Sequence, residues 1–391
     1  MAITRSDFTQ ISEADLLELI DTGVPEGQTI EYKSAPYGKT DTDKREFLKD
    51  VTAFANTKGG HLVIGMRAND GVASHLVPMT EAIDEEKLRM EQLLQSGIEP
   101  RLYSVEIGEV IAGGGKVLVL RIPRSWNAPH RVTSQNSNRF YARNSAGVYE
   151  PSTQELREMF NAASELSRRI EDFRNGRLKE MSKIGLPIPK LNEQSNLVMH
   201  IVPHSSFSAN QGIELRAIRN YGFGFSPLGG SSASHRYNFH GLVRFRVGPI
   251  CFGYTQLFRT GAIEATKFRI EHEGGGLLFI GSANCNQILE GLEMYLGELK
   301  FLGIQCPITV MLTFQNVAGK FVGSNFNQPD GDNEIVENDL NLPPCIIEEY
   351  SNKQEIARLL RPAFDALWNA GGHNGCPHYD ADGNWQSSTR S

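Results

Sequence analysis

A carboxylate and an ammonium group stand two residues apart in the segment 28–34, at Glu31 and Lys33. The alternation in this segment predicts a strand, and side chains two apart on a strand share one face. Glu31 and Lys33 therefore point the same way, while Ile30 and Tyr32 can pack in a core on the other face. Such a pair suits phosphodiester hydrolysis, because a carboxylate can hold a divalent cation and a lysine can stabilise developing phosphate charge. An ordinary solvated strand face is the alternative.

Further acids are needed nearby, because a single carboxylate holds a divalent cation poorly. Glu26 lies five residues before Glu31, and Asp70 lies in the turn after the next predicted strand. Asp50, on the polar face of the intervening helix, is a less suitable third ligand. We expect Glu26, Glu31 and Asp70 to bind Mg²⁺ or Mn²⁺. The cation would polarise a phosphoryl oxygen and activate a water, with Lys33 assisting.

A stretch without acidic residues follows, since the segment Val110–Tyr149 contains neither Asp nor Glu. Its basic residues and histidine are Lys116, Arg121, Arg124, His130, Arg131, Arg139 and Arg143. Because the guanidinium group recognises phosphate with paired hydrogen bonds, the stretch predicts a surface for a nucleic-acid backbone. The expected phosphate contacts are Arg124, Arg131, Arg139 and Arg143. Of the neighbouring Phe140 and Tyr141, one is expected to pack inward, which leaves the other to stack on a base. The alternative is a plain polar surface.

The remaining pattern of residues 1–165 predicts the elements that position these side chains. Helices are expected over 13–21, from Thr42 or Asp43 onward, over 83–95, and from Pro151 onward; strands are expected over 61–66, 102–110, 116–122 and 138–144. Asn56, before Gly59 and Gly60, is expected to end the second helix with left-handed backbone, and a phosphate contact is the alternative. The order of elements indicates an α+β fold class, with a mixed α/β domain first.

The second half of the chain predicts a long helix and then a second α+β domain, of unknown role, over residues 197–370. Residues 166–196 are expected to hold the helix end and a linker, because Gly185–Asn196 contains two prolines and few apolar residues. Residues 371–391 are expected to be a mobile tail, and His373, Cys376 and His378 within it are a weaker candidate for metal binding.

Composition excludes several classes of protein. The chain has 391 residues, of which 40% are hydrophobic and 22% charged, so two globular domains are expected and a disordered chain is not. Its net charge of −7 argues against a generic polyanion binder. Five scattered cysteines argue against a disulfide framework. No apolar run approaches the roughly 18–20 residues of a membrane span. We therefore expect a cytoplasmic protein with no membrane partner. The sequence leaves open whether the protein forms a homo-oligomer.

Three groups of segments resemble the Schlafen-type AlbA-like domain of bacterial proteins and of animal Schlafen proteins. They are EGQTIEYKS, KDVTAFANTKGGHLVIGM, and PHR with FYAR and PSTQEL downstream. The resemblance covers about residues 12–165. It implies a metal-dependent endoribonuclease site with two glutamates and an aspartate, acting on tRNA and rRNA. The glutamates match Glu26 and Glu31, and the lysine matches Lys33. Arg67 and Ala68 occupy the position of the aspartate, so Asp70 is the nearest acid.

Two hypotheses follow from the residues and the resemblance together. The first is a metal-dependent endoribonuclease that cleaves RNA such as tRNA, as a defence or toxin-like effector. The second is a non-catalytic protein that binds RNA or DNA as a transcriptional regulator, or that senses a nucleotide. The first hypothesis requires three acids to meet around one cation. The second requires a surface of exposed basic side chains.

Overall fold

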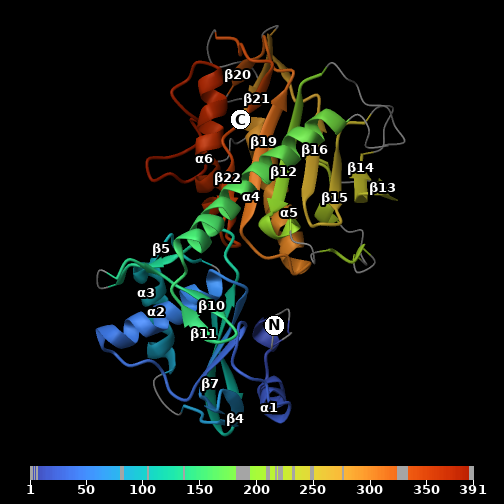
Figure 1. Cartoon of the computed structure of the whole chain (residues 1–391). Helices are drawn as coiled ribbons and strands as arrows, with labels where there is room; N and C mark the ends of the chain where they lie inside the picture. Colours follow the sequence, from blue (N-terminus) through green and yellow to red (C-terminus); the bar gives the residue numbers. More distant parts are fainter. Residues whose placement is uncertain are drawn as a thin grey trace. The chain divides into compact units, whose positions relative to one another are not determined.

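The structure is a computed structural model that describes residues 3, 5, 8–79, 83–103, 105–134, 137–181, 194–207, 212–215, 218, 223–230, 234–246, 251–274, 277–323 and 333–386. The chain divides into two compact units, Met1–Ser167 and Arg168–Ser391. Both units mix helices with sheets, which confirms the expected α+β class. The division falls inside α4 (Thr153–Glu180), the long green helix of Figure 1. Most of the expected linker, residues 182–193, lies outside the described residues.

A four-stranded mixed sheet forms the centre of the first unit, with the strand order β1-β2-β7-β6. β1 (Ile30–Lys33) and β2 (Gly59–Ile64) are parallel, because α2 (Asp41–Ala55) crosses over between them. β7 (Gly115–Pro123) and β6 (Glu106–Ala112) continue the sheet in antiparallel register. β1 is therefore an edge strand, and one side of its backbone needs partners from outside the sheet.

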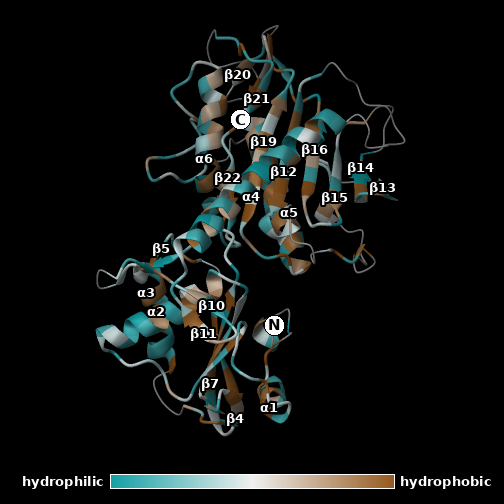
Figure 2. Ribbon diagram, viewed as in Figure 1, coloured by the Kyte–Doolittle hydropathy of each residue, from teal (hydrophilic) through white to brown (hydrophobic). Residues whose placement is uncertain are grey.

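Alternation along these strands separates two apolar layers. On one face, Leu62 and Leu120 pack with Phe47 and Phe54 of α2, and α3 (Ile83–Gly97) closes this layer. On the other face, Ile30, Tyr32 and Val63 pack against α1 (Glu13–Asp21). Figure 2 shows β7, which lies between the two layers, mainly in brown. Side chains of β1 that do not point to α1 must therefore point to the side of α2.

Short strands complete the first unit. β3 (Met66–Asn69) and β4 (Val72–Leu76) form one hairpin, and β10 (Ala142–Asn144) and β11 (Gly147–Tyr149) form another; β5 (Ile98–Glu99), β8 (Arg131–Val132) and β9 (Arg139–Phe140) form a small sheet.

Asn56 holds some of these short elements against α2. It ends the helix as expected, but with right-handed backbone at φ −75°, and Gly59 provides the positive φ instead. The Asn56 Nδ2 donates to the backbone oxygens of His130 and Tyr141, each at 2.8 Å, and its Oδ1 accepts from the His130 backbone N–H at 2.7 Å. The side chain is buried and fully used within the fold, so the structural interpretation of Asn56 holds and the phosphate contact does not.

The second unit contains a long antiparallel sheet with the strand order β13-β14-β15-β16-β12-β19-β21, to which β22 is added beside β19. Its strands are β12 (Asn196–Pro203), β13 (Ser234–Asn238), β14 (Gly241–Phe245), β15 (Tyr254–Phe258), β16 (Ile263–Phe268), β19 (Ile308–Gln315), β21 (Asp339–Asn341) and β22 (Cys345–Ile347). A smaller sheet holds β17 (His272–Gly274), β18 (Leu277–Gly281) and β20 (Phe321–Gly323).

Helices cover both faces of the long sheet. α5 (Ser282–Phe301) and α6 (Lys353–Ala370) pack on one face, where Leu197, Met199 and Ile201 of β12 enter the large core. The intervening side chains of β12 point to the opposite face. There the end of α4 lies across the strands, because Phe173 contacts His200 and Phe258 at ring-centroid distances of 5.8 and 5.4 Å.

The chain after α6 is packed, at least as far as residue 386, so the mobile tail expected from residue 371 onward is wrong for this part. Trp385 is 5% exposed and its indole Nε1 donates to the Asn286 side chain at 3.1 Å. Cys376 is also buried, and His378 hydrogen-bonds the Ser282 hydroxyl. Aromatic and polar side chains of the segment itself thus provide the contacts that fix it. Within the described ranges, no helix is long and apolar enough to cross a membrane.

We predict that Asn56→Ala destabilises the protein by on the order of 3 kcal/mol, because three buried backbone groups lose their partner. Chemical denaturation followed by circular dichroism measures the change. Asn144→Ala is the matched control, since the Asn144 side chain is exposed and accepts a local backbone N–H from Ala146. If both substitutions lowered the free energy of unfolding by the same small amount, this would contradict the role of Asn56 in holding these short elements against α2.

We also predict that acid destabilises both units. Burial, with the nearby charge of Arg121, lowers the pKa of His61 to about 4, and burial lowers the pKa of His204 to about 4. An unfolded histidine titrates near 6.5, so the unfolded chain binds more protons between these values. The free energy of unfolding should therefore fall as the pH falls from about 6.5 to about 4.

Denaturant titrations across this pH range test the second prediction. His61→Gln should flatten the slope, whereas His75→Gln, at an exposed position in the same unit, should leave it unchanged. A slope that is the same in all three proteins would show that His61 is not responsible.

Candidate functional site

Glu31 and Lys33 lie on the same face of β1, as the sequence predicts, and Ile30 and Tyr32 are buried on the other. The Lys33 Nζ donates to a carboxylate oxygen of Glu31 at 2.7 Å. Both side chains point to the side of α2, where acidic and basic groups from other elements meet them. The local prediction is therefore confirmed, and the partners decide what the pair can do.

Arg143 is the main partner of Glu31. Its guanidinium forms a short ion pair with the Glu31 carboxylate and donates to the backbone oxygens of Gly27 and Ile30. It also stands over the ring of Phe54, 4.6 Å from the centroid, and only 2% of its side chain is exposed. Arg143 thus satisfies the free edge of β1 and ties β10 to it. The expected phosphate contact at Arg143 is wrong, because the guanidinium is buried by these partners.

Lys33 has a second partner in Asp50 of α2. The Lys33 Nζ lies 3.4 Å from a carboxylate oxygen of Asp50, and the Tyr37 hydroxyl donates to the same oxygen at 2.6 Å. Burial favours the neutral amine, but Asp50 and Glu31 outweigh it and raise the pKa of Lys33. Two carboxylates and two cations, Glu31, Asp50, Lys33 and Arg143, therefore form a cluster whose formal charges cancel.

Of the remaining predicted acids, Glu26 lies beside this cluster and Asp70 lies in the turn after β3. The Glu26 carboxylate accepts the Tyr32 backbone N–H at 3.0 Å, and burial together with the negative charge of Glu31 raises its pKa. The turn after β3 does reach Glu26, because the Glu26 backbone N–H donates to the Gly71 oxygen at 2.6 Å. Asp70 itself is exposed, with a positive φ of 49°.

These residues do not fit the expected metal site. Burial tends to raise the pKa of Glu31, but hydrogen bonds from Lys33 and Arg143 hold it below its usual range, so the carboxylate is ionised and already neutralised. A cation would have to displace both partners. Among the described residues, no three His, Cys, Asp or Glu side chains are grouped closely enough to hold a metal ion. The metal site at Glu26, Glu31 and Asp70 therefore stays a prediction that the geometry of the described residues does not support.

The acid-free stretch 110–149 does not form one continuous positive surface. Arg121 and His130 are buried, as Arg143 is. Arg121 donates to His61, to Glu106 and to the Arg5 backbone oxygen, while the His130 ring hydrogen-bonds Ser125. The acids that neutralise this stretch come from outside it, which the local composition does not show.

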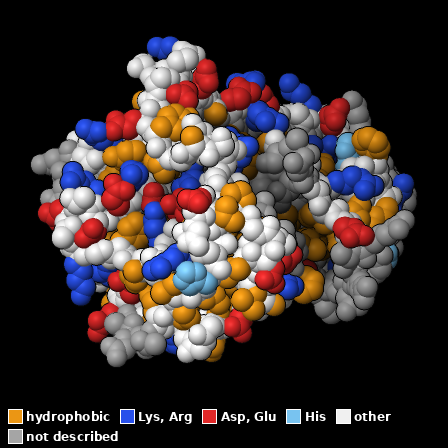
Figure 3. Space-filling view, turned by 60° about the horizontal axis from the view of Figure 1, so that its bottom comes forward, with side chains coloured by type: hydrophobic (Ala, Val, Ile, Leu, Met, Phe, Trp, Pro, Cys, Tyr) orange, Lys and Arg blue, Asp and Glu red, His pale blue; other side chains and the backbone are white. Residues whose placement is uncertain are grey.

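Three of the predicted arginines are accessible. Arg124 is exposed beside Trp126, with the guanidinium 5.9 Å from the ring centroid. Arg131 pairs with Glu99, which lies opposite it across β5 and β8. Arg139 pairs with Glu150, and both side chains are more than half exposed. On the face drawn in Figure 3, Lys and Arg side chains lie among Asp and Glu side chains.

Arg139 and Tyr141 meet the polar face of α2 around a cavity of about 400 Å³. The cavity, here called the α2 cavity, is lined by Thr42, Arg45, Glu46, Lys49, Ser137, Arg139 and Tyr141. Three cations and one carboxylate line it. Of the two neighbouring aromatic residues, Tyr141 lines the cavity, whereas Phe140 packs edge-on against Phe160.

The α2 side of this cavity is absent from the residues predicted from the sequence, although a signal for it exists. Thr42, Arg45, Glu46 and Lys49 follow the spacing i, i+3, i+4 and i+7, which places them on one face of a helix. This polar face lies opposite the apolar face from which the helix was predicted.

We predict that Glu31→Ala destabilises the protein by about 3 kcal/mol, because it leaves the buried Arg143 charge without its carboxylate. Glu31→Ala/Arg143→Leu should recover part of the loss. Asp70→Asn, at an exposed position that asparagine tolerates at positive φ, should have little effect.

Thermal unfolding with and without Mn²⁺ separates the structural role of Glu31 from metal binding. A metal ligand would make Mn²⁺ raise the Tm of the unsubstituted protein and not that of Glu31→Ala. A Tm of Glu31→Ala equal to that of the unsubstituted protein would contradict the structural role.

Known proteins resemble the first unit of the chain. No curated protein matches the chain. Residues 26–152 match the family model of the domain described as Schlafen, AlbA_2. Among solved structures, the DIP2311 protein of Corynebacterium diphtheriae is similar at 17% identity and a TM-score of 0.28, over 38% of this chain. The match spans 28% of the length of that protein.

A second solved structure is the N-terminal domain of a putative ATP-dependent DNA helicase RecG-related protein from Nitrosomonas europaea. It is similar at 22% identity and a TM-score of 0.28, over 37% of this chain and 93% of that domain. The family match covers the sheet, α2, the buried charge cluster and the α2 cavity. The resemblance expected from the sequence is thus confirmed: the chain carries a Schlafen/AlbA_2 domain over residues 26–152.

Proposed function

We propose that the Schlafen/AlbA_2 domain binds nucleic acid through the α2 cavity. The observation that carries this proposal is the convergence of Arg45, Lys49 and Arg139 on one polar hollow beside Tyr141. The family match supports a nucleic-acid-related role, and the geometry supports a binder over a nuclease because the acids of the charge cluster are neutralised.

The cations around the cavity are available to phosphate. The half-buried Lys49 pairs with the exposed Glu46 at 2.7 Å, and Arg139 pairs with Glu150 where both side chains are exposed. Such pairs contribute little to stability, so a phosphate oxygen can replace the carboxylate at small cost. Arg45 is exposed, and within the described part of the chain its hydrogen bond at 3.4 Å goes to the Thr42 hydroxyl. Tyr141 provides a ring that a base of a single strand can stack against.

A metal-dependent endoribonuclease is the second candidate, favoured by one observation. Glu26 and Glu31 lie close enough for the charge of Glu31 to raise the pKa of Glu26, as expected for two acids of one site. Cleavage of tRNA in Mn²⁺ that Glu26→Ala abolishes would establish it. Binding without cleavage would favour a non-catalytic regulator. For either function we propose a cytoplasmic location, as the sequence analysis expects.

We predict that Arg45→Ala/Lys49→Ala/Arg139→Ala weakens binding of single-stranded RNA. Removing phosphate contacts should lower the slope of log K against log salt by roughly one for each cation that touches a phosphate. Fluorescence anisotropy at several salt concentrations, with chelator present, measures both quantities. Parallel titrations with single-stranded DNA and tRNA show which nucleic acid is preferred.

The matched control removes three exposed cations elsewhere in the same unit, as Lys58→Ala/Arg67→Ala/Arg101→Ala. This control changes the net charge by the same amount as the variant of the α2 cavity. It should therefore retain the affinity for RNA and most of the slope of log K against log salt. Equal weakening by the two triple variants would show that the α2 cavity is not the binding site.

A further inference from the structure

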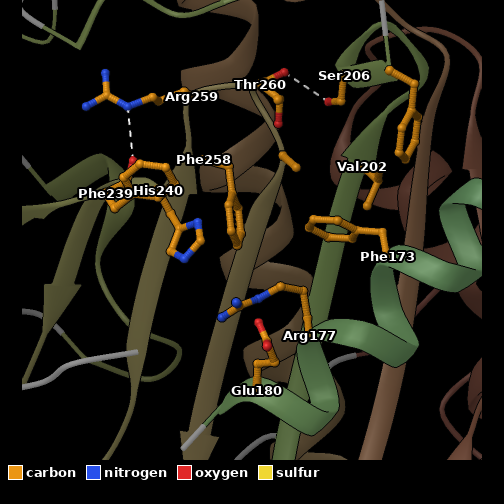
Figure 4. A pocket seen from close by; sticks show the side chains of 12 residues that line it. Phe173, Arg177, Glu180, Val202, Ser206, Phe239, His240, Phe258, Arg259 and Thr260 are labelled. Atoms are coloured by element: carbon orange, nitrogen blue, oxygen red, sulfur yellow. Dashed lines mark hydrogen bonds between the residues drawn. The ribbon is translucent and has the colours of Figure 1, made fainter. Parts of the chain in front are cut away.

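A larger cavity lies within the second unit, between the end of α4 and the sheet, and has a volume of about 740 Å³ (Figure 4). This size falls within the range of pockets that hold small molecules. Aromatic side chains dominate its lining: Phe173, Phe207, Phe239, His240 and Phe258. We call it the aromatic cavity. Apolar walls with a few polar groups at their ends are the usual composition of a ligand site.

The aromatic groups form the middle of the cavity. Phe258 stands at the centre, edge-on to Phe173 at 5.4 Å and to His240 at 6.0 Å between ring centroids. In Figure 4 the rings of Phe173, Phe258 and His240 point into the same space, with Val202 beside them. Edge-on packing leaves ring surface facing that space, so a flat aromatic group can pack against it.

The mouth of the cavity carries an exposed phenylalanine that its turn holds in place. Phe239 is 89% exposed, at the tip of the β13–β14 hairpin. The Asn238 side chain accepts the backbone N–H groups of His240 and Gly241, and the Arg259 Nε donates to the Phe239 backbone oxygen. These hydrogen bonds fix the backbone of the turn that carries the ring, and the ring itself contacts His240 edge-on at 5.4 Å between centroids.

The two ends of the cavity differ in charge. At one end Arg177 donates to Glu264 through two hydrogen bonds of 2.9 Å, and the Glu180 carboxylate lies beside the same guanidinium. Of these three groups, Arg177 and Glu180 line the cavity, and Glu264 is buried behind them. At the other end the exposed guanidinium of Arg259 lies above Phe239, to whose backbone oxygen its Nε donates. Arg169, 4.7 Å from the ring of Phe207, adds a second exposed cation.

We infer that the aromatic cavity binds a nucleoside monophosphate whose base carries an exocyclic amine. The base would pack among Phe173, Phe258 and His240, with Phe239 covering it. The acidic end accepts hydrogen bonds from the amine, as carboxylates accept them from base edges. Arg259 meets the phosphate, which suits the fork of a guanidinium. The cavity lies wholly in the second unit, so this site does not depend on nucleic-acid binding by the first.

Other ligand classes fit less well. A fatty acyl chain has no polar group to place at the end formed by Arg177 and Glu180 and would not use the flat ring surfaces. An inorganic anion alone would leave the aromatic middle without a partner. A planar ring with a donor at one end and an anion at the other uses all three regions of the cavity.

Isothermal titration calorimetry on the full chain tests the inference with AMP, IMP, adenosine and inorganic phosphate. We expect AMP to bind with one site per chain. IMP, which lacks the amine, and adenosine, which lacks the phosphate, should each bind at least about tenfold more weakly, a difference of about 1.4 kcal/mol. Phosphate alone should not bind detectably. Absence of AMP binding at about 1 mM, or equal affinity for AMP and IMP, would overturn the inference.

Two variants with matched controls locate the site. Phe239→Ala and Arg259→Ala should each weaken AMP binding about tenfold or more. Phe301→Ala, at another exposed phenylalanine of the same unit, and Arg236→Ala, at another exposed arginine, should not. Both test positions are exposed, so folding should be preserved. Equal losses in tests and controls would overturn the assignment.

The triple variant of the α2 cavity distinguishes this inference from the proposed function. Arg45→Ala/Lys49→Ala/Arg139→Ala should leave AMP binding intact, because those residues belong to the first unit. Loss of AMP binding in this variant would place the nucleotide in the α2 cavity and refute the aromatic cavity as its site.

Discussion

The buried ion pair between Arg143 and Glu31 determines how the β10–β11 hairpin packs on the first sheet and how the Glu31 carboxylate can be used. A guanidinium that is almost fully removed from water costs several kcal/mol unless a carboxylate and other acceptors surround it. Glu31 provides the carboxylate, and the edge carbonyls of Gly27 and Ile30 provide the other acceptors. The pair therefore joins the last hairpin of the domain to the free edge of its first strand. A carboxylate used in this way holds the fold together and is poorly placed to hold a metal.

Charge neutrality in the cluster leaves its charged groups occupied by one another. Lys33 and Asp50 balance each other as Arg143 and Glu31 do, so the interior attracts neither a cation nor a phosphate strongly. α2 separates the two environments, because its apolar face packs on the sheet and its polar face turns to solvent. The cations that remain exposed beside that polar face are the ones a polyanion can reach. This division leaves the cations beside the polar face of α2 as the accessible ones, and the proposed function depends on them rather than on the most concentrated group of acids.

Local sequence patterns predicted the helices and strands well, because the spacing of apolar residues along one segment depends on that segment alone. Alternation in β1 placed Glu31 and Lys33 on one face, and the apolar stripe of α2 was found from its spacing. The same patterns could not show which arginines are buried. Glu31, Glu99 and Glu150 neutralise Arg143, Arg131 and Arg139 from outside the acid-free stretch, so the pairing appears only after folding. Asn56 likewise meets partners more than seventy residues away, which no local signal at a helix end can reveal.

The second unit contains a buried ion pair of the same kind, but its surroundings differ. Arg177 and Glu264 join α4 to β16, as Arg143 and Glu31 join β10 to β1. Around Arg143, the backbone oxygens of Gly27 and Ile30 and the ring of Phe54 lie against the guanidinium and bury it. Beside Arg177, the rings of Phe173 and Phe258 stop short of closing the space and leave a cavity. Charged groups whose neighbours complete the packing serve stability. Charged groups at the end of a preformed aromatic cavity still face a space that a ligand can fill.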